Sequence, residues 1–338
     1  MKKKREIQVI LDSNDWAVAT VVNNVKENIH NFDICKQKKA QIRCKRIVHY
    51  ASFPEFYRER KKLRMLHYLG NTIIVTCFHI VDGNSDYNTI VKYDRYVDVW
   101  HTSCRITQNK MINMGIQKEK IQVIPIPVNS NIFNLKYDEQ TILQIQKQIK
   151  IPLGYSVIGS FQKDGNGWGE GMEPKLIKGP DLFCDAVEQI AKKTPVFVLL
   201  SGPARGYVKN RLEKANIPYS HVYFNESEMV ANLYKFIDIY IMASREEGGP
   251  MSVLESMASG VPIVATRVGQ APDIIESGKN GVLVDIGDVQ AIATAAEKIL
   301  TDKEYRESLI AEGLKTVPRF DAKNAARKYE KQLYTIGE

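Results

Sequence analysis

The sequence predicts an α/β protein with two domains, each built around a parallel sheet. Short runs of β-branched residues alternate with helical stretches along the 338 residues, an order typical of layered α/β folds. Most of these runs are continuously apolar, which favours central strands covered by helices on both faces. Two domains also suit the length, at roughly 150 residues per domain.

The order of elements follows from these runs and from the helical stretches between them. Strands are predicted at residues 7–11, 72–79, 122–128, 156–161, 196–201, 238–244 and 262–266. Helices are predicted at residues 181–192, 226–236, 289–300 and 303–314. A polar helix follows the strand at 122–128, and a new strand begins at Ser156. We therefore place the boundary between an N-terminal domain, 1–150, and a second domain, 151–318.

Composition excludes several classes of protein. The chain is 44% hydrophobic and 25% charged, as in ordinary globular proteins and unlike disordered or collagen-like ones. No apolar stretch reaches the ~18 to 20 residues that span a bilayer. The basic start, Met1 to Arg5, precedes an apolar run too short for an export signal. Five cysteines without a C-x-x-C pair favour a reducing compartment, so we expect a cytoplasmic protein.

Positive charge is concentrated in the first half of the chain. Residues 1–150 hold 25 Lys and Arg against 14 Asp and Glu, and much of the excess lies between Lys36 and Arg64. Such a half can face nucleic acid, an anionic membrane or a phosphorylated acceptor, or it can be a solvated surface. No RNP, KH or zinc-finger pattern accompanies it, so we do not expect a nucleic-acid partner.

The segment 244–266 predicts a phosphate-binding βαβ unit. A strand ends at Ser244, Gly248 and Gly249 make a turn, and Pro250 stands where the first helical residue is expected. Gly260 suits the C-terminal exit of this helix. The turn and the helix start direct backbone N–H groups and a positive dipole toward the carboxyl edge of the sheet, where a phosphate can bind.

Two carboxylates flank this turn with seven residues between them, Glu247 and Glu255. Glu255 lies roughly 7 Å along the helix axis from Pro250, at ~1.5 Å per residue. With a pyrophosphate at the helix start, a sugar could reach Glu247 and a ribose could reach Glu255. Glu246 competes for the first role, and ordinary solvated carboxylates are the structural alternative.

The chain resembles the retaining group 1 (family 4) glycosyltransferases, which have the GT-B fold. The match lies in Glu247–Pro250 with residues 254–266, in the blocks at 268–275 and 280–284, and in Lys178-Gly179-Pro180-Asp181. The resemblance implies two Rossmann-like domains with parallel sheets facing across a cleft. It also implies that the final helix, within 319–338, packs back on the N-terminal domain.

The resemblance assigns a role to each candidate site residue. Catalytic roles fall on Glu247, which contacts the donor sugar, Lys178, which pairs with the phosphate, and His79, near the donor sugar. Donor-binding roles fall on Gly248, Gly249, Pro250, Met251 and Ser252 at the pyrophosphate, Glu255 at the ribose, and Gly202 near the base. The family's second basic residue, an arginine, is absent here, and Lys163 and Arg205 are both candidates for it.

The implied reaction transfers a hexose from a nucleotide-diphosphate sugar, with a UDP-sugar favoured, to a hydroxyl acceptor with retained configuration. The acceptor would be a glycan or a lipid-linked saccharide, as in polysaccharide biosynthesis. We expect no cofactor and no metal, because helix amides and lysines can replace a divalent cation at the pyrophosphate. The basic half suggests peripheral association with the inner face of a membrane. A sugar-nucleotide epimerase of similar fold and a non-catalytic sugar-nucleotide-binding protein remain alternatives. A nicotinamide dehydrogenase is not expected, since no G-x-G-x-x-G turn follows an early strand.

Overall fold

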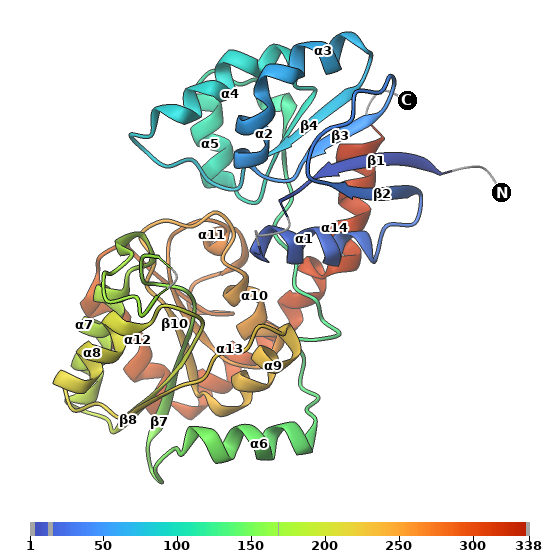
Figure 1. Cartoon of the computed structure of the whole chain (residues 1–338). Helices are drawn as coiled ribbons and strands as arrows, with labels where there is room; N and C mark the ends of the chain where they lie inside the picture. The colour runs from blue at the N-terminus through green and yellow to red at the C-terminus, as the bar shows by residue number, and fades with distance from the viewer. Residues whose placement is uncertain (1–3, 13–15, 168, 336–338) are drawn as a thin grey trace. The chain divides into compact units, whose positions relative to one another are not determined.

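A computed structural model describes residues 4–12, 16–167 and 169–335, and the chain divides into two compact units (Figure 1). Unit 1 comprises residues 1–127 and 320–338, and unit 2 comprises 128–319. The sequence placed the boundary after residue 150, whereas residues 128–150 group with unit 2. One reason is the hydrogen bond that Ser220 Oγ donates to the carbonyl of Ile149 at 2.6 Å. The first three residues of the basic N-terminus lie outside the described residues.

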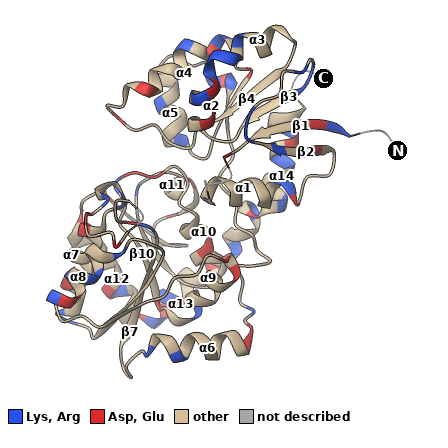
Figure 2. Cartoon of the chain, in the orientation of Figure 1, with Lys and Arg blue, Asp and Glu red and all other residues tan. Residues whose placement is uncertain are grey.

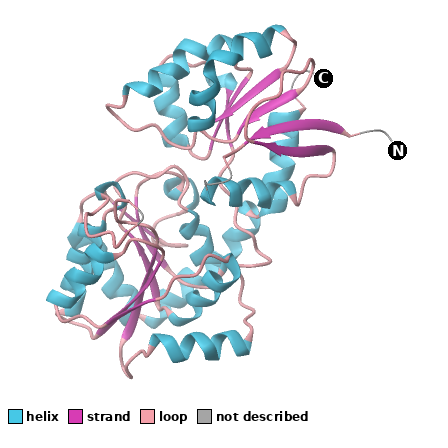
Figure 3. Ribbon diagram, viewed as in Figure 1, coloured by secondary structure: helices cyan, strands magenta, loops and turns pink. Residues whose placement is uncertain are grey.

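Unit 1 contains a parallel sheet whose described strands run in the order β2-β1-β3-β4-β5-β6. The strands are β1 (Arg5–Ile10), β2 (Phe32–Gln37), β3 (Ile47–Tyr50), β4 (Thr72–Thr76), β5 (Val99–Thr102) and β6 (Ile121–Val123). The α-helices are α1 (Trp16–Lys26), α2 (Phe53–Glu59), α3 (Leu63–Tyr68), α4 (Asn88–Tyr93), α5 (Arg105–Asn113) and α14 (Ala322–Tyr329). Figure 3 shows helices on both sides of this sheet.

Both faces of this sheet are apolar, because successive residues of a strand point to opposite faces. On β4, Ile73 and Val75 pack with residues of α2, α3, α4 and α5. Ile74, between them, packs with residues of α1 and α14. This burial on two sides explains why the strand is a continuous apolar run.

The C-terminal segment belongs to unit 1 and is joined to its sheet by a directed chain of hydrogen bonds. Tyr334 Oη lies 3.0 Å from His49 Nδ1, and His49 Nε2 lies 2.8 Å from Thr76 Oγ1. Thr76 Oγ1 lies 2.9 Å from His101 Nδ1, and His101 Nε2 lies 3.1 Å from the carbonyl of Ile124. That carbonyl can only accept, so each imidazole donates from Nε2 and Tyr334 donates to His49. Burial lowers the pKa of His49 to about 3 and that of His101 to about 4, which keeps both rings neutral.

A small cavity lies beside this chain in unit 1, lined by His49, Thr76, Phe78, Tyr329, Tyr334 and six aliphatic residues of the core. Its volume is about 20 Å³. A cavity of this size holds little more than one water molecule. It is therefore too small for a nucleotide sugar.

Unit 2 contains a second parallel sheet, with described strands in the order β12-β11-β10-β7-β8-β9. The strands are β7 (Ser156–Phe161), β8 (Val196–Ser201), β9 (Tyr219–His221), β10 (Ile239–Met242), β11 (Ile263–Thr266) and β12 (Val282–Val284). The α-helices are α6 (Glu139–Ile149), α7 (Pro180–Ala191), α8 (Gly206–Lys214), α9 (Ser227–Leu233), α10 (Met251–Ala258), α11 (Ala271–Ile274), α12 (Val289–Thr301) and α13 (Lys303–Thr316).

This order has the Rossmann pattern, in which the chain reverses direction along the sheet after its first three strands. The reversal falls between the neighbours β7 and β10. Ligands of such sheets bind outside the carboxyl ends of the strands at this switch point. The predicted donor-site residues that follow β7 and β10 therefore lie where the topology favours a ligand.

Candidate functional site

A cation and a carboxylate meet at the carboxyl edge of the unit 2 sheet. Lys178 Nζ lies 2.6 Å from Glu247 Oε1. Ser244 Oγ donates to the same oxygen at 3.0 Å. Glu247 follows β10, and Lys178 ends the 3₁₀ turn η5 (Leu176–Lys178) that precedes α7. The structure therefore brings together two site residues that are 69 positions apart in the sequence.

Gly179 allows Lys178 to reach this position. Its φ is +63°, and a Cβ there would overlap the carbonyl oxygen of Ala243 at the end of β10. Arg245 strengthens the same junction, since its guanidinium bonds to both carboxylate oxygens of Asp181 at 2.7 and 2.6 Å. Only glycine permits both this backbone conformation and this close approach. This explains why a glycine follows Lys178 in the Lys-Gly block.

The turn before α10 has the predicted shape, with the helix starting one residue later. Pro250 is the N-cap, with ψ 110°, so the first helical residue is Met251. Gly260 ends the helix with φ +69°, as its position in the sequence suggested. Gly269 supports the turn, because a Cβ there would lie 2.5 Å from the carbonyl oxygen of Gly248. Ser252 lies in the first helical turn, where backbone N–H groups have no partner within the helix.

Glu255 lies in α10 against a group of aromatic rings. Tyr234 Oη donates to Glu255 Oε2 at 3.2 Å. The Tyr234 ring stacks with Tyr240, with centroids 5.8 Å apart, and Phe161 packs edge-on against both. Burial raises the pKa of Glu255 to about 7, and the bond from Tyr234 opposes that rise. A change of charge on this carboxyl group is therefore possible near neutral pH.

A further lysine, Lys175, lies close to both Lys163 and Lys178. Lys163 follows β7 and is half-buried. Lys175 precedes the η5 turn, three residues before Lys178, so the two are neighbours on the turn. Burial lowers the pKa of Lys175, and the charges of Lys178 and Lys163 lower it further, whereas Glu247 raises it. Lys175 therefore lies within electrostatic reach of Lys178, Lys163 and Glu247.

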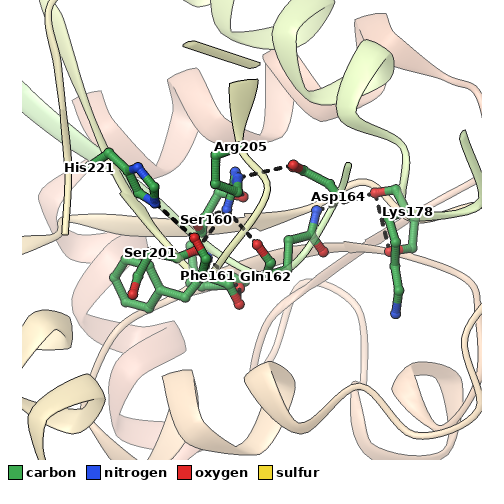
Figure 4. Close-up of polar contacts among 11 residues, drawn as sticks. Ser160, Phe161, Gln162, Asp164, Lys178, Ser201, Arg205 and His221 are labelled. Atoms are coloured by element: carbon green, nitrogen blue, oxygen red, sulfur yellow. Dashed lines mark hydrogen bonds and ion pairs between the residues drawn. The ribbon is translucent and has the colours of Figure 1, made fainter. Parts of the chain in front are cut away.

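Arg205 and Gly202 follow β8 at the same edge. Arg205 was a candidate for phosphate contact, yet its side chain is fully buried. It bonds to Asp164 and to backbone carbonyls, as Figure 4 shows. Gly202 has φ +98°, and a Cβ there would lie 2.5 Å from the carbonyl oxygen of Gln162. Its role in the structure is the close approach of the ends of β7 and β8.

His79 belongs to unit 1. It is exposed and follows β4 by three residues, at the carboxyl edge of that sheet. Its role as a contact of the donor sugar rests on the resemblance alone.

Among the residues described, no three or more His, Cys, Asp or Glu side chains form a group able to hold a metal ion. In the same part of the chain, no helix combines the length and the apolar character needed to cross a membrane.

Several residues that shape the site have no signal in the sequence. Ser244, Asp164 and Tyr234 touch the proposed functional side chains, but none belongs to a motif that signals its partner. Lys175 is the one whose place near the site could have been predicted. It stands three residues before Lys178, just ahead of the Gly-Pro start of a helix, and residues with this spacing share one side of a 3₁₀ turn.

Part of the chain matches a protein-family model. Residues 173–316 match the family model of the Glycosyl transferases group 1. This group 1 segment begins just before Lys175 and Lys178 and ends with α13, so it contains Glu247 and Glu255. Arg205 also lies within it, whereas Lys163 and His79 lie outside.

Two curated relatives each match less than half of the chain. The lipopolysaccharide core biosynthesis mannosyltransferase LpsB of Rhizobium meliloti (strain 1021) is 29% identical over 161 residues, which is 44% of this chain and 46% of that protein. The N-acetyl-alpha-D-glucosaminyl L-malate synthase of Bacillus anthracis is 26% identical over 46% of this chain and 40% of its own length. The chain therefore spans less than half the length of these relatives.

Solved structures match over the whole chain and show the GT-B fold. The structure of Anabaena Alr3699/HepE in complex with UDP and glucose has a TM-score of 0.78 at 14% identity, covering 99% of this chain and 100% of that one. Sucrose-phosphate synthase from Thermosynechococcus elongatus has a TM-score of 0.75 at 16% identity, covering 98% of both chains. The predicted fold class is confirmed.

Proposed function

We propose that the chain is a retaining hexosyltransferase of the family 4 type. It would move a hexose from a nucleotide-diphosphate sugar to a hydroxyl group of a saccharide or lipid-linked acceptor. One observation carries the proposal. Lys178, which precedes α7, pairs with Glu247, which follows β10, at the switch point of a Rossmann-type sheet. The first turn of α10 begins just after Glu247, and Glu255 lies farther along α10. Cation, helix amides and two carboxylates suit the diphosphate, the sugar and the ribose of one donor.

The chemical step follows from these positions. The bond between the sugar's anomeric carbon and the phosphate oxygen breaks, and a bond to the acceptor oxygen forms. Lys178, Lys163 and the amides of α10 would stabilise the negative charge that develops on the leaving diphosphate. The departing phosphate oxygen would accept the acceptor's proton on the same face of the sugar, so the anomeric configuration is retained. Glu247 would accept hydrogen bonds from sugar hydroxyl groups rather than attack, since Lys178 and Ser244 already engage its Oε1.

A UDP-sugar is the favoured donor, and HepE, of similar fold, was crystallised with UDP and with UDP-glucose. Thermal shifts with UDP-, GDP- and ADP-sugars, followed by NMR of the product's anomeric proton, test donor and stereochemistry together. Stabilisation by one donor class and a product of unchanged configuration are expected. No shift with any nucleotide sugar would contradict the proposal. Conversion of the donor sugar without any acceptor would indicate an epimerase, and binding without turnover a non-catalytic sugar-nucleotide-binding protein.

Metal independence is part of the proposal, because lysines supply positive charge beside Glu247. Transfer should continue at the same rate after EDTA treatment. Loss of activity with EDTA that Mg²⁺ or Mn²⁺ restores would overturn this part. His79 would contact the donor sugar, and His79→Ala should then lower turnover without changing the melting temperature.

We also propose that unit 1 binds the anionic inner face of a membrane, consistent with a cytoplasmic protein. Residues 36–71 hold eleven Lys and Arg, and their two acidic residues, Glu55 and Glu59, are buried. The loop before β3 and the α2–α3 region meet, since Glu59 Oε2 accepts from the amide of Ala40 at 2.8 Å. Ile42 and Tyr68 are exposed within this range of residues. Figure 2 shows Lys and Arg in blue along α2 and α3. Basic surfaces with exposed apolar side chains suit anionic lipid.

Vesicle flotation tests this surface directly. The wild type should float with vesicles that contain phosphatidylglycerol and not with pure phosphatidylcholine. Charge reversal at exposed Lys38, Lys39 and Lys61 should reduce flotation at least tenfold. The same number of reversals at exposed lysines of unit 2, Lys192→Glu, Lys214→Glu and Lys303→Glu, should leave it unchanged. Equal binding to both vesicle types would remove the membrane proposal.

A further inference from the structure

Arg205 lies between β8 and α8 with its guanidinium fully buried. Nη1 donates to the carbonyls of Ser160, Gln162 and Ser201 at 2.7, 3.0 and 2.9 Å, and Nη2 donates to Ser160 Oγ at 3.1 Å. Nε lies 3.0 Å from Asp164 Oδ1. Figure 4 shows these contacts converging on one side chain. Arg205 therefore binds the ends of β7 and β8 together.

The charge of Arg205 is neutralised inside the protein by Asp164. Asp164 is as fully buried as Arg205, so the two side chains form an ion pair away from water. Burial raises the pKa of Asp164, and the charge of Arg205 opposes that rise. A buried guanidinium that is neutralised by a carboxylate and bonded to three carbonyls is poorly suited to bind a phosphate. Loss of either partner would leave a buried charge uncompensated, which is strongly destabilising.

The same contacts extend to the lysines of the candidate site. Lys163 lies in the sequence between Gln162, whose carbonyl accepts from Arg205, and Asp164, whose carboxylate pairs with it. Gln162 Nε2 donates to the carbonyl of Lys178 at 3.3 Å. The amide of Lys175 donates to the carbonyl of Asp164 at 2.8 Å. The backbones of Lys175 and Lys178 are thus hydrogen-bonded to residues of this network, and Lys163 is covalently linked to two of them.

We propose that Arg205, with Asp164 as its counter-charge, is a positioning residue that holds Lys163, Lys175 and Lys178 in place for the donor diphosphate. The inference rests on the proposed function for the identity of the ligand. Three like charges repel one another, so a rigid framework is needed to keep them close. Fixed cations need no reorganisation when charge develops on the leaving group, which is the basis of electrostatic preorganisation. It follows that Lys163, rather than Arg205, is the second cation of the donor site.

The experiment compares Arg205→Lys with Arg211→Lys, a matched change within α8, the helix that follows Arg205. Arg211 is partly exposed and bonds to Asp185 and Glu188. Lysine keeps the charge at position 205 but cannot make the four directed hydrogen bonds. We expect Arg205→Lys to weaken UDP binding, measured by calorimetry, at least tenfold. Arg211→Lys should bind UDP as the wild type does.

A double mutant separates positioning from general damage to the fold. If Arg205 acts through the lysines, Arg205→Lys should weaken UDP binding less than threefold when Lys178 is already alanine. Full additivity of the two losses would overturn the inference, and so would unchanged binding by a folded Arg205→Lys protein. Should Arg205→Lys not fold, Ser160→Ala, which removes only the 3.1 Å contact, provides a milder variant with the same expected direction.

A second measurement needs no nucleotide. Acetylation rates of individual lysines, read by mass spectrometry, report their environment. Arg205→Lys should change the rates at Lys175 and Lys178 at least threefold and leave exposed Lys303 unchanged, whereas Arg211→Lys should change none of them. Unchanged rates at all lysines would overturn the inference. A wild type that binds none of UDP, GDP and ADP would contradict the proposed function instead, and the acetylation rates would still decide the role of Arg205.

Discussion

Lys178 Nζ and Glu247 Oε1 are 2.6 Å apart at the switch point of the unit 2 sheet. The pair is partly shielded, since the two side chains are 25% and 13% exposed. The proposed function assigns each residue to a different part of the donor, Lys178 to the phosphate and Glu247 to the sugar. Their contact therefore couples the two halves of the site, and a change in one will alter the charge available to the other.

Glu247→Gln should separate binding from turnover. Loss of the carboxylate releases Lys178 from its ion pair, so UDP should bind as tightly as to the wild type or more tightly. Turnover should fall by about 10² to 10³, the usual effect of removing one group that stabilises a transition state. Calorimetry with UDP and steady-state transfer rates measure the two effects. Near-wild-type turnover would refute the assigned role, and Glu246→Gln serves as the control.

Donor affinity should depend on pH through Glu255. Its pKa is raised to about 7 by burial, and a ribose diol donates hydrogen bonds best to the ionised form. Affinity for UDP should therefore increase as the pH rises from 6 to 8. Glu255→Gln should bind weakly and without this dependence. Tyr234→Phe removes the hydrogen bond that lowers the pKa, so the midpoint should move to higher pH. A midpoint that does not move contradicts the assignment.

Gly179→Ala should damage both the fold and the site. The added Cβ would overlap the carbonyl oxygen of Ala243, in addition to the strain of a φ of +63°. Gly278→Ala is the matched control, because its φ is +82° with open space around it. The control should lose about 1 to 2 kcal/mol of unfolding free energy from the left-handed backbone alone. Gly179→Ala should lose more and should also weaken UDP binding. Chemical denaturation and calorimetry measure these effects, and equal losses in both variants would contradict the steric argument.

Buried histidines should make unit 1 sensitive to acid. The pKa of His49 is lowered to about 3, chiefly by burial and further by His101. Below the unfolded value of about 6.5, the unfolded chain takes up a proton that the folded protein does not. Stability from this group is therefore complete above pH 6.5 and is lost as the pH falls toward 3, by about 1.4 kcal/mol per pH unit.

His49→Gln should remove this part of the pH dependence. The difference in unfolding free energy between pH 7 and pH 5 should shrink by about 2 kcal/mol relative to the wild type. Urea titrations at the two pH values measure it. His30→Gln, a change at an exposed side chain, should leave the difference unchanged. An equal slope in His49→Gln and wild type would show that the buried ring does not resist protonation.

The predicted elements that match the structure are those whose signal is local and strong. β7 at 156–161 and β8 at 196–201 have the predicted bounds, and both are apolar runs covered on two sides. β2 and β3 were missed. β2 alternates buried and exposed residues, and β3 has only four. Neither pattern differs enough from a loop in the sequence alone.

By itself the sequence determined the turn and helix around Glu247 and Glu255, because strand end, glycine turn and helix start involve neighbours in the chain. Tertiary structure decided which distant side chains meet. It paired Lys178 with Glu247, and it buried Arg205 against Asp164. Arg205 could not be distinguished from a phosphate ligand in the sequence, since a basic residue after a strand looks the same whether it points to solvent or into the core. Burial, and with it the raised pKa of Glu255, arises only when the sheets and helices pack.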